Sequence, residues 1–178
     1  MSTPMRISSR DIPLSEITLR RYEKPGTSDR RELVKKLCLS LGLLNPGDSR
    51  DVIVDIFCAL MDSKKRKRWV RAEELKEAIL SRRKARNLSE SGCALSNIRR
   101  QLFRLRNIGM VEKSRNRYRI VEFSELPRVF EEKTLRYILE PTLERIREHL
   151  SAVESAYSAT RKTKTLNTTL ILEENRGS

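Results

Sequence analysis

The chain has 178 residues, of which 38 are Lys or Arg and 24 are Asp or Glu, so its formal net charge is +14. A surplus of this size favours a polyanionic partner, either nucleic acid or an anionic membrane surface, and a thermophile's charged surface would not explain the imbalance of sign. No stretch reaches the ~18 apolar residues of a membrane-spanning helix, which argues against a protein that crosses a membrane.

Residues 1–48 predict an N-terminal arm followed by helices. The arm is expected over residues 1–13, and a short helix over residues 14–24, where a Pro-Gly pair ends it. A longer helix follows, capped by Thr27 or Ser28. Leucines recur along this helix at the spacing of one buried face: Leu33, Leu37, Leu41 and Leu44.

Residues 49–123 predict a globular domain that begins with an amphipathic helix, capped by Asp48 or Ser49. Its expected inner face consists of Ile53, Ile56, Phe57, Leu60 and Met61. The basic run over residues 64–68 is either a solvated loop or a phosphate contact. A short extended piece at Trp69 and Val70 then leads into a second helix of this domain. The inward residues of that helix are expected to be Ala72, Leu75 and Ile79.

The stretch NIRRQLFRLRNIGMVEKSRNRYRI, residues 97–120, predicts a helix joined to a β-hairpin. The helix is expected to begin near Ser91 and to turn Ile98, Leu102 and Leu105 towards the core. Gly109 stands where the end of a helix favours a residue that tolerates a positive φ. Apolar strand-type residues then flank a basic turn and predict the hairpin: Val111, Tyr118, Ile120 and Phe123.

Residues 124–157 predict a long helix with a restart or kink at Pro141. Its apolar side chains step by 3, 4, 3 and 4 residues, the spacing of a short coiled-coil seam: Leu143, Ile146, Leu150, Val153 and Tyr157. This seam either pairs with a second copy of the chain or packs against helices of the same chain. Residues 158–178 are rich in Thr and predict a flexible tail.

The stretch IRRQLFRLRNIGMVEK resembles the end of the recognition helix in winged helix-turn-helix transcription regulators of the MarR, ArsR and PadR type, which are prokaryotic or archaeal. The residues that carry the resemblance are Ile98, Leu102, Leu105, Gly109, Met110, Val111 and Glu112. It covers about residues 49–122, and the long linker over residues 81–93 departs from it. The resemblance implies a mainly α fold with a small β-hairpin, here with an N-terminal helical extension and a long C-terminal helix.

The resemblance also implies that the third helix enters the major groove of double-stranded DNA. The outward side chains of this helix are then Ser96, Asn97, Arg99, Arg100, Phe103 and Arg104. We expect Ser96, Asn97 and Arg100 to contact base edges, and Arg99 and Arg104 to contact phosphates or bases. The hairpin tip would contact the backbone or the minor groove through Lys113, Arg115, Asn116 and Arg117. Paired C-terminal helices would make the regulator a homodimer on palindromic sites.

Other classes of protein find little support in the sequence. There is no P-loop, dinucleotide fingerprint or nucleophile elbow, and His149 is the one histidine, so neither an enzyme nor a cofactor is expected. Cys38, Cys58 and Cys93 are too far apart for an ordinary zinc site and are predicted to be buried free thiols in a reducing cytoplasm. A nucleoid-associated location and a thermophilic or archaeal source follow as expectations from the charge.

Two alternative functions stay open. One is a less specific nucleic-acid-binding protein, which acts in chromosome organisation, replication or plasmid partition, or on RNA. The other is a winged-helix module that binds protein through its third helix. The sequence identifies no effector ligand.

Overall fold

The computed structural model describes residues 12–174, with side chains for residues 12–158. The chain is mainly helical with a small three-stranded antiparallel sheet. In chain order the elements are α1 (Arg30–Ser40), α2 (Val52–Lys65), β1 (Val70–Arg71), α3 (Ala72–Ala85), α4 (Leu95–Asn107), β2 (Val111–Ser114), β3 (Arg117–Ile120), a 3-10 turn (Val121–Phe123), α5 (Leu126–Val129), a π-helical segment (Phe130–Leu139) and α6 (Glu140–Glu174). The chain divides into two units after Ile138, so α1 shares a unit with the expected 49–123 domain instead of forming a separate part.

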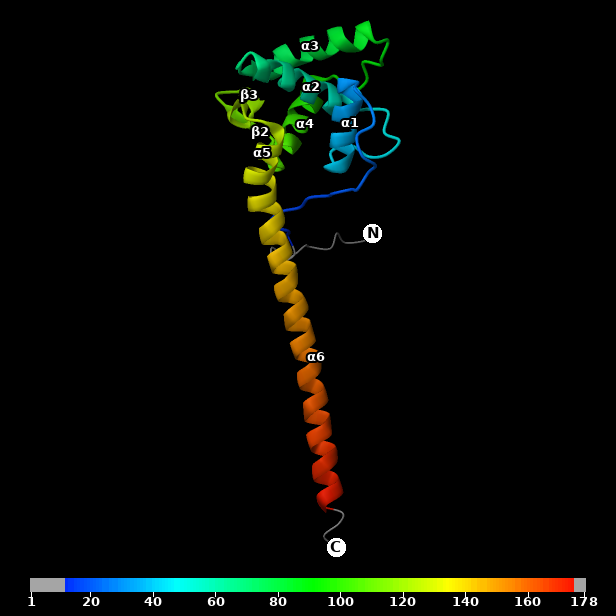
Figure 1. The fold of residues 1–178 in the computed structure, drawn as a ribbon, viewed down its shortest axis with the longest axis vertical. Helices are drawn as coiled ribbons and strands as arrows, with labels where there is room; N and C mark the ends of the chain where they lie inside the picture. The colour runs from blue at the N-terminus through cyan, green and yellow to red at the C-terminus, as the bar shows by residue number, and fades with distance from the viewer. Residues whose placement is uncertain (1–11, 175–178) are drawn as a thin grey trace, which may run out of the picture. The chain divides into compact units, whose positions relative to one another are not determined.

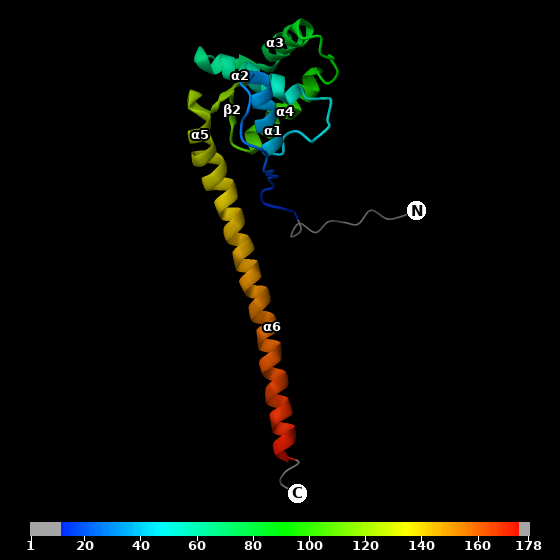
Figure 2. The same cartoon turned by 45° about the vertical axis from the view of Figure 1, so that its right-hand side comes forward.

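α2 is the central helix of the first unit. Figures 1 and 2 show α1, α3 and α4 arranged around it. Of the predicted inner face, Ile53, Ile56, Phe57 and Leu60 are buried and Met61 is half-buried, and Val52, Val54 and Ala59 on the other sides of the helix are buried as well. Because α2 buries side chains on more than one side, this helix forms the centre of the hydrophobic core.

β3 is the middle strand of the sheet, whose order is β1, β3, β2. The predicted hairpin is formed by β2 and β3, which pair from Val111 opposite Ile120. β1 adds a third strand, with Arg71 opposite Arg117. Because side chains alternate along a strand, Tyr118 and Ile120 of β3 face the core.

Four buried charged side chains tie α1, α2 and α3 together. Arg31 of α1 donates to Asp51 at 2.7 Å and to Asp55 at 3.0 Å. Arg83 of α3 donates to the same two carboxylates, at 3.0 Å to Asp51. Its Nε also donates to the Ser89 carbonyl at 2.5 Å. We call Arg31, Asp51, Asp55 and Arg83 the buried ionic cluster; nothing in the helical periodicity predicted it.

Because of the buried ionic cluster, the free energy of unfolding is expected to fall at acid pH. Burial alone would raise the pKa of Asp51, but hydrogen bonds from Arg31 and Arg83 outweigh it and hold that pKa below its ordinary value. This contribution to stability is fully present above about pH 4, where an unfolded Asp titrates, and is lost as the pH falls through the lower folded pKa. Acid unfolding followed by circular dichroism should therefore steepen below about pH 4, and Asp51→Asn should flatten that limb.

The exposed carboxylate Asp48 is the control for this measurement. Asp48→Asn should leave the acid limb as steep as in the unaltered protein. An unchanged slope in Asp51→Asn would contradict the proton linkage assigned to the cluster.

The end of α4 is held by the segment that follows the sheet. The buried Thr134 hydroxyl donates to the Ile108 carbonyl at 2.6 Å. Gly109, predicted to take a positive φ, has φ +78, and a Cβ there would lie 2.9 Å from Cβ of Lys133. Glycine is therefore required both by the backbone conformation and by the close approach of the π-helical segment.

Thr134→Val should lower the free energy of unfolding by about 1–3 kcal/mol, because it leaves the buried Ile108 carbonyl without its partner. Thr134→Ser keeps the hydroxyl and should recover most of that loss. Urea unfolding of the two variants measures the difference. Equal loss in both would mean that the methyl group, not the hydrogen bond, stabilises this contact.

The predicted short helix over residues 14–24 is wrong, since the structure has neither helix nor strand there. The backbone amide of Arg20 donates to the Ser40 carbonyl at 2.8 Å, and its guanidinium donates to the Leu44 carbonyl at 3.0 Å. These bonds satisfy a carbonyl of the last residue of α1 and one in the connection that follows it. The segment crosses so close to Gly42 that a Cβ there would lie 2.5 Å from the Thr18 carbonyl.

Three helix starts differ from the prediction. Asp29, not Thr27 or Ser28, caps α1 and accepts from the Glu32 amide at 3.1 Å. α2 begins at Val52 after Asp51, whose side chain points into the buried ionic cluster and makes no cap bond to this helix. α4 begins at Leu95 instead of near residue 91, because Gly92 has φ +86, which no right-handed helix allows.

The C-terminal part also differs from the prediction. Phe123, predicted as a strand residue, lies in the 3-10 turn with φ 52. The restart expected at Pro141 corresponds to the change from the wide turns of the π-helical segment to α6 at Glu140. The backbone of α6 continues to Glu174, where a flexible tail was predicted. Residues 1–11 of the expected arm and residues 175–178 lie outside the described residues.

All three cysteines are free thiols, as predicted. Cys38 and Cys93 are buried, whereas Cys58 is half-buried. Burial raises the pKa of Cys38 to about 12. Among the described residues, no helix is long and apolar enough to cross a membrane.

Candidate nucleic-acid interface

α4 presents one buried face and one open face. Ile98, Leu102 and Leu105 are completely buried, as the helical spacing predicted. The open face carries Ser96, Arg99, Arg100 and Phe103, all exposed, and Phe103 is 56% exposed. The open face therefore combines two cationic side chains with one aromatic ring, groups that can pair with phosphates and stack on bases.

Arg99 is paired with Glu73 of α3 at 2.7 Å. A hydrogen bond from its own backbone amide lowers the pKa of Glu73 and outweighs desolvation, and Arg99 lowers that pKa further. Both side chains are more than half exposed. Such surface pairs contribute about 0–1 kcal/mol, so a phosphate can replace Glu73 as the partner of Arg99 at little cost.

Asn97, predicted to read a base, is held by its own helix start. Its amide nitrogen donates to the Gly92 carbonyl at 2.7 Å. Its amide oxygen accepts from Arg100 at 2.8 Å and from Gln101 at 3.1 Å. These three bonds order the loop before α4 and orient Arg100.

Arg104, also predicted on the open face, instead packs on the connection between α1 and α2. It donates to the Gly42 carbonyl at 3.1 Å and to Gln101 at 2.9 Å. Burial and the neighbouring Arg100 lower its pKa, although a guanidinium stays charged in proteins. Arg104 is thus half-buried and not fully open to solvent as expected, because helical spacing does not reveal the contact with the connection at Gly42.

The hairpin tip is the second basic element. Its turn residues Arg115 and Asn116 have φ 46 and 61, the signature of a two-residue primed turn. Arginine is unfavourable in this conformation, and its presence at the tip favours a functional role over a structural one. Lys113, Arg115, Asn116 and Arg117 are all exposed, as the sequence predicted.

The residues at the start of α3 lie next to both basic elements. Arg71, the last residue of β1, lies opposite Arg117 in the sheet. Two residues later Glu73 binds Arg99 of α4. Residues 71–73 therefore adjoin both the hairpin and the open face of α4. We define the basic strip as Arg71, Arg99, Arg100, Lys113, Arg115 and Arg117, all exposed.

The sequence did not identify Arg71 as a site residue. It follows the extended piece at Trp69 and Val70, but nothing in the sequence indicates that this piece pairs with the hairpin.

Arg119, although basic, lies at the base of the hairpin and not in the basic strip. Its guanidinium is 4.3 Å from the Trp69 ring centre and 4.6 Å from that of Phe123. It also pairs with Glu112, whose carboxylate accepts from the Glu122 amide at 2.8 Å. This stack fixes the hairpin base and leaves the tip to project.

The described residues contain no group of three or more His, Cys, Asp or Glu side chains suited to a metal ion. Comparison of the chain with protein-family models, with curated proteins and with solved structures finds no match.

Proposed function

We propose that the protein is a sequence-specific transcription regulator that binds double-stranded DNA through a winged helix-turn-helix. The order of α2, β1, α3, α4 and the β2–β3 hairpin is the order of that fold. The single observation that carries the proposal is that exposed cations of β1, α4 and the hairpin meet at residues 71–73, where Arg71 lies opposite Arg117 and Glu73 binds Arg99. A protein-binding third helix would not require six exposed cations from three separate elements.

In this proposal α4 enters the major groove. Arg100 and Ser96 read base edges near the start of the helix, and Phe103 makes apolar contacts. Arg99 exchanges Glu73 for a phosphate. Asn97 acts through Arg100 rather than on a base, which departs from the role expected from sequence.

The hairpin tip binds the DNA backbone next to that groove. Lys113, Arg115 and Arg117 contact phosphates, and Asn116 lies between the two tip arginines. Arg71 adds a phosphate contact at the start of α3. These contacts position α4 on the duplex and give most of the salt dependence.

The homodimer is part of the proposal. Leu143, Ile146, Leu150, Val153 and Tyr157 of α6 are between 47% and 75% exposed. They share one side of the helix at coiled-coil spacing, so a second copy would bury them. Two copies related by a two-fold axis would present two α4 helices to the halves of a palindromic site.

Leu150→Asp should convert the dimer to a monomer, seen as a halved mass in light scattering. Removing two buried leucines per dimer costs about 3 kcal/mol or more, and the new carboxylates repel each other. His149→Ala, one residue away on the exposed helix, should leave the mass unchanged. A halved mass in both variants, or in neither, would argue against this seam.

Binding to genomic fragments and to random duplex at about 50 and about 200 mM salt tests the function. A regulator should keep a preference of about 10³ or more for its own fragments at the higher salt. If binding to all duplexes weakened equally at the higher salt, the protein would instead be the less specific nucleic-acid binder. Equal binding of structured RNA would indicate the RNA-associated role, and no binding of either would leave the protein-interaction module.

A further inference from the structure

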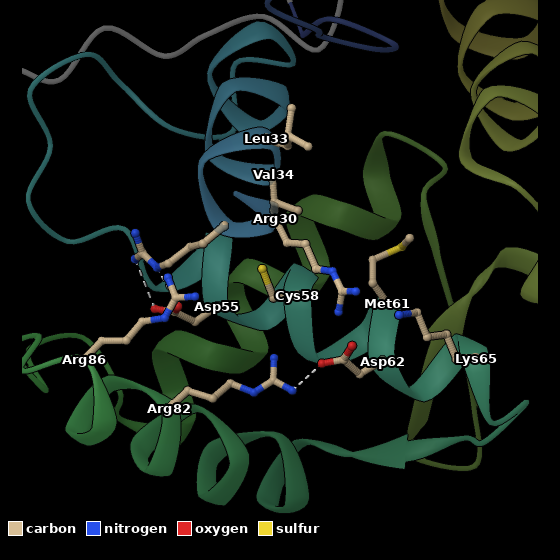
Figure 3. A pocket seen from close by; sticks show the side chains of 11 residues that line it. Arg30, Leu33, Val34, Asp55, Cys58, Met61, Asp62, Lys65, Arg82 and Arg86 are labelled. Atoms are coloured by element: carbon tan, nitrogen blue, oxygen red, sulfur yellow. Dashed lines mark hydrogen bonds and ion pairs between the residues drawn. The ribbon is translucent and has the colours of Figure 1, made fainter. Parts of the chain in front are cut away.

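A pocket of about 480 Å³ lies between α1, α2 and α3 of the first unit (Figure 3). Its apolar wall consists of Leu33 and Val34 of α1 with Cys58 and Met61 of α2. Small-molecule sites in proteins have volumes of about 300–1,000 Å³ and are mostly apolar. The pocket is therefore large enough for a small organic molecule, and its wall suits an apolar one.

The charged side chains of this pocket are unbalanced. Five cationic residues line it, Arg30, Arg31, Lys65, Arg82 and Arg86, against the two carboxylates of Asp55 and Asp62. The buried ionic cluster already contains Arg31 and Asp55, and Arg82 pairs with Asp62 at 2.5 Å. The other three cations, Arg30, Lys65 and Arg86, have no carboxylate partner within the pocket. The lining therefore attracts an anion.

Two of these cations are free to bind a ligand. Among the described residues, neither Arg30 nor Lys65 has an ion-pair partner, and Arg86 reaches only Asp29, at 3.8 Å. Figure 3 shows Arg30 extending from α1 over the pocket and Lys65 entering from α2. Both approach the apolar wall near Met61, so a ligand could place its anionic end between them and its apolar end against the wall.

We propose that this pocket binds a small amphiphilic anion, a monocarboxylate with an unbranched or aromatic apolar body. Inorganic phosphate would gain the cations but leave the apolar wall in contact with water, and a neutral apolar molecule would leave the cations unused. The site is separate from the basic strip. Arg82 lies near the end of α3 and Arg71 just before its start, and a helix of 14 residues is about 20 Å long.

Calorimetric titration of the full chain with decanoate tests the site, and it uses no DNA, so its outcome does not depend on the proposed function. Decanoate should bind at least about tenfold more tightly than decanol or inorganic phosphate. Arg30→Ala with Lys65→Ala should weaken decanoate binding by about tenfold or more. Lys67→Ala with Lys84→Ala removes the same charge outside the pocket and should change nothing.

Modification of Cys58 by a thiol reagent gives an independent measurement. Cys58 lies on the pocket wall and is half-buried, whereas Cys38 and Cys93 are buried. Saturating decanoate should slow the modification of Cys58 by about tenfold or more, and decanol should not. Equal binding of decanol, an unaffected double variant, or an unprotected Cys58 would each overturn the proposal.

Discussion

Arg83→Ala is expected to lower the free energy of unfolding by about 3–5 kcal/mol, measured by urea unfolding. The side chain is buried and donates to both Asp51 and Asp55. Its removal leaves two buried carboxylates with one arginine, Arg31, between them. It also leaves the Ser89 carbonyl without the donor that fixes the linker after α3.

Arg86 provides the matched control for this variant. It is three residues further along, is half exposed, and reaches Asp29 at 3.8 Å. Arg86→Ala should change the free energy of unfolding by less than about 1 kcal/mol. If Arg83→Ala were as mild as Arg86→Ala, the buried ionic cluster would not be what holds α1, α2 and α3 together.

Alanine substitutions in the basic strip are expected to separate specificity from general affinity. Arg100→Ala should cost about 1–3 kcal/mol on the preferred site and relax the preference between sites. Arg115→Ala with Arg117→Ala should weaken all duplexes alike and reduce the slope of affinity against salt by about 2. The reason is that base edges carry sequence information and phosphates do not.

The control for charge removes two cations elsewhere on α3 and its linker. Lys84→Ala with Arg86→Ala has the same loss of charge as the hairpin double variant, but Lys84 lies in the last turn of α3 and Arg86 directly after it, outside the basic strip. It should leave the salt slope within experimental error. If this pair reduced affinity as strongly as the hairpin pair, general charge and not the basic strip would govern binding.

The sequence predicted the parts of the interface that depend on local spacing. The apolar steps Ile98, Leu102 and Leu105 defined the buried face of α4, and Gly109 marked its end. The alternation around the basic turn gave the hairpin. These signals are local, because helical and strand periodicities are set by neighbouring residues.

The sequence did not predict what depends on contacts between distant segments. Arg83 and Arg31 look like surface charges, since arginines are seldom fully buried unless paired. Arg104 lies on the outward side by periodicity, but its guanidinium binds the Gly42 carbonyl in the connection between α1 and α2. The side-chain amide of Asn97 is bound by the Gly92 carbonyl, in the loop before α4, and helical spacing does not indicate that contact. In each case the decisive partner is remote in sequence or lies in a loop.

The prediction of helix boundaries was wrong for a related reason. Residues 14–24 have helical spacing, yet their hydrogen-bonding groups bind the end of α1, and that tertiary contact outweighs local propensity. The seam of α6 was predicted from spacing alone, and its side chains are exposed in the single chain. Its pairing therefore stays a prediction.

Photo-crosslinking from single positions tests the central claim most directly. A photoreactive phenylalanine analogue would replace Phe103 on α4, Arg115 at the hairpin tip or Arg86 after α3, and each protein would be irradiated with its selected duplex. The proposal predicts adducts to DNA from positions 103 and 115 and none from position 86. Adducts from position 86 with none from positions 103 and 115 would contradict docking of the basic strip on the duplex.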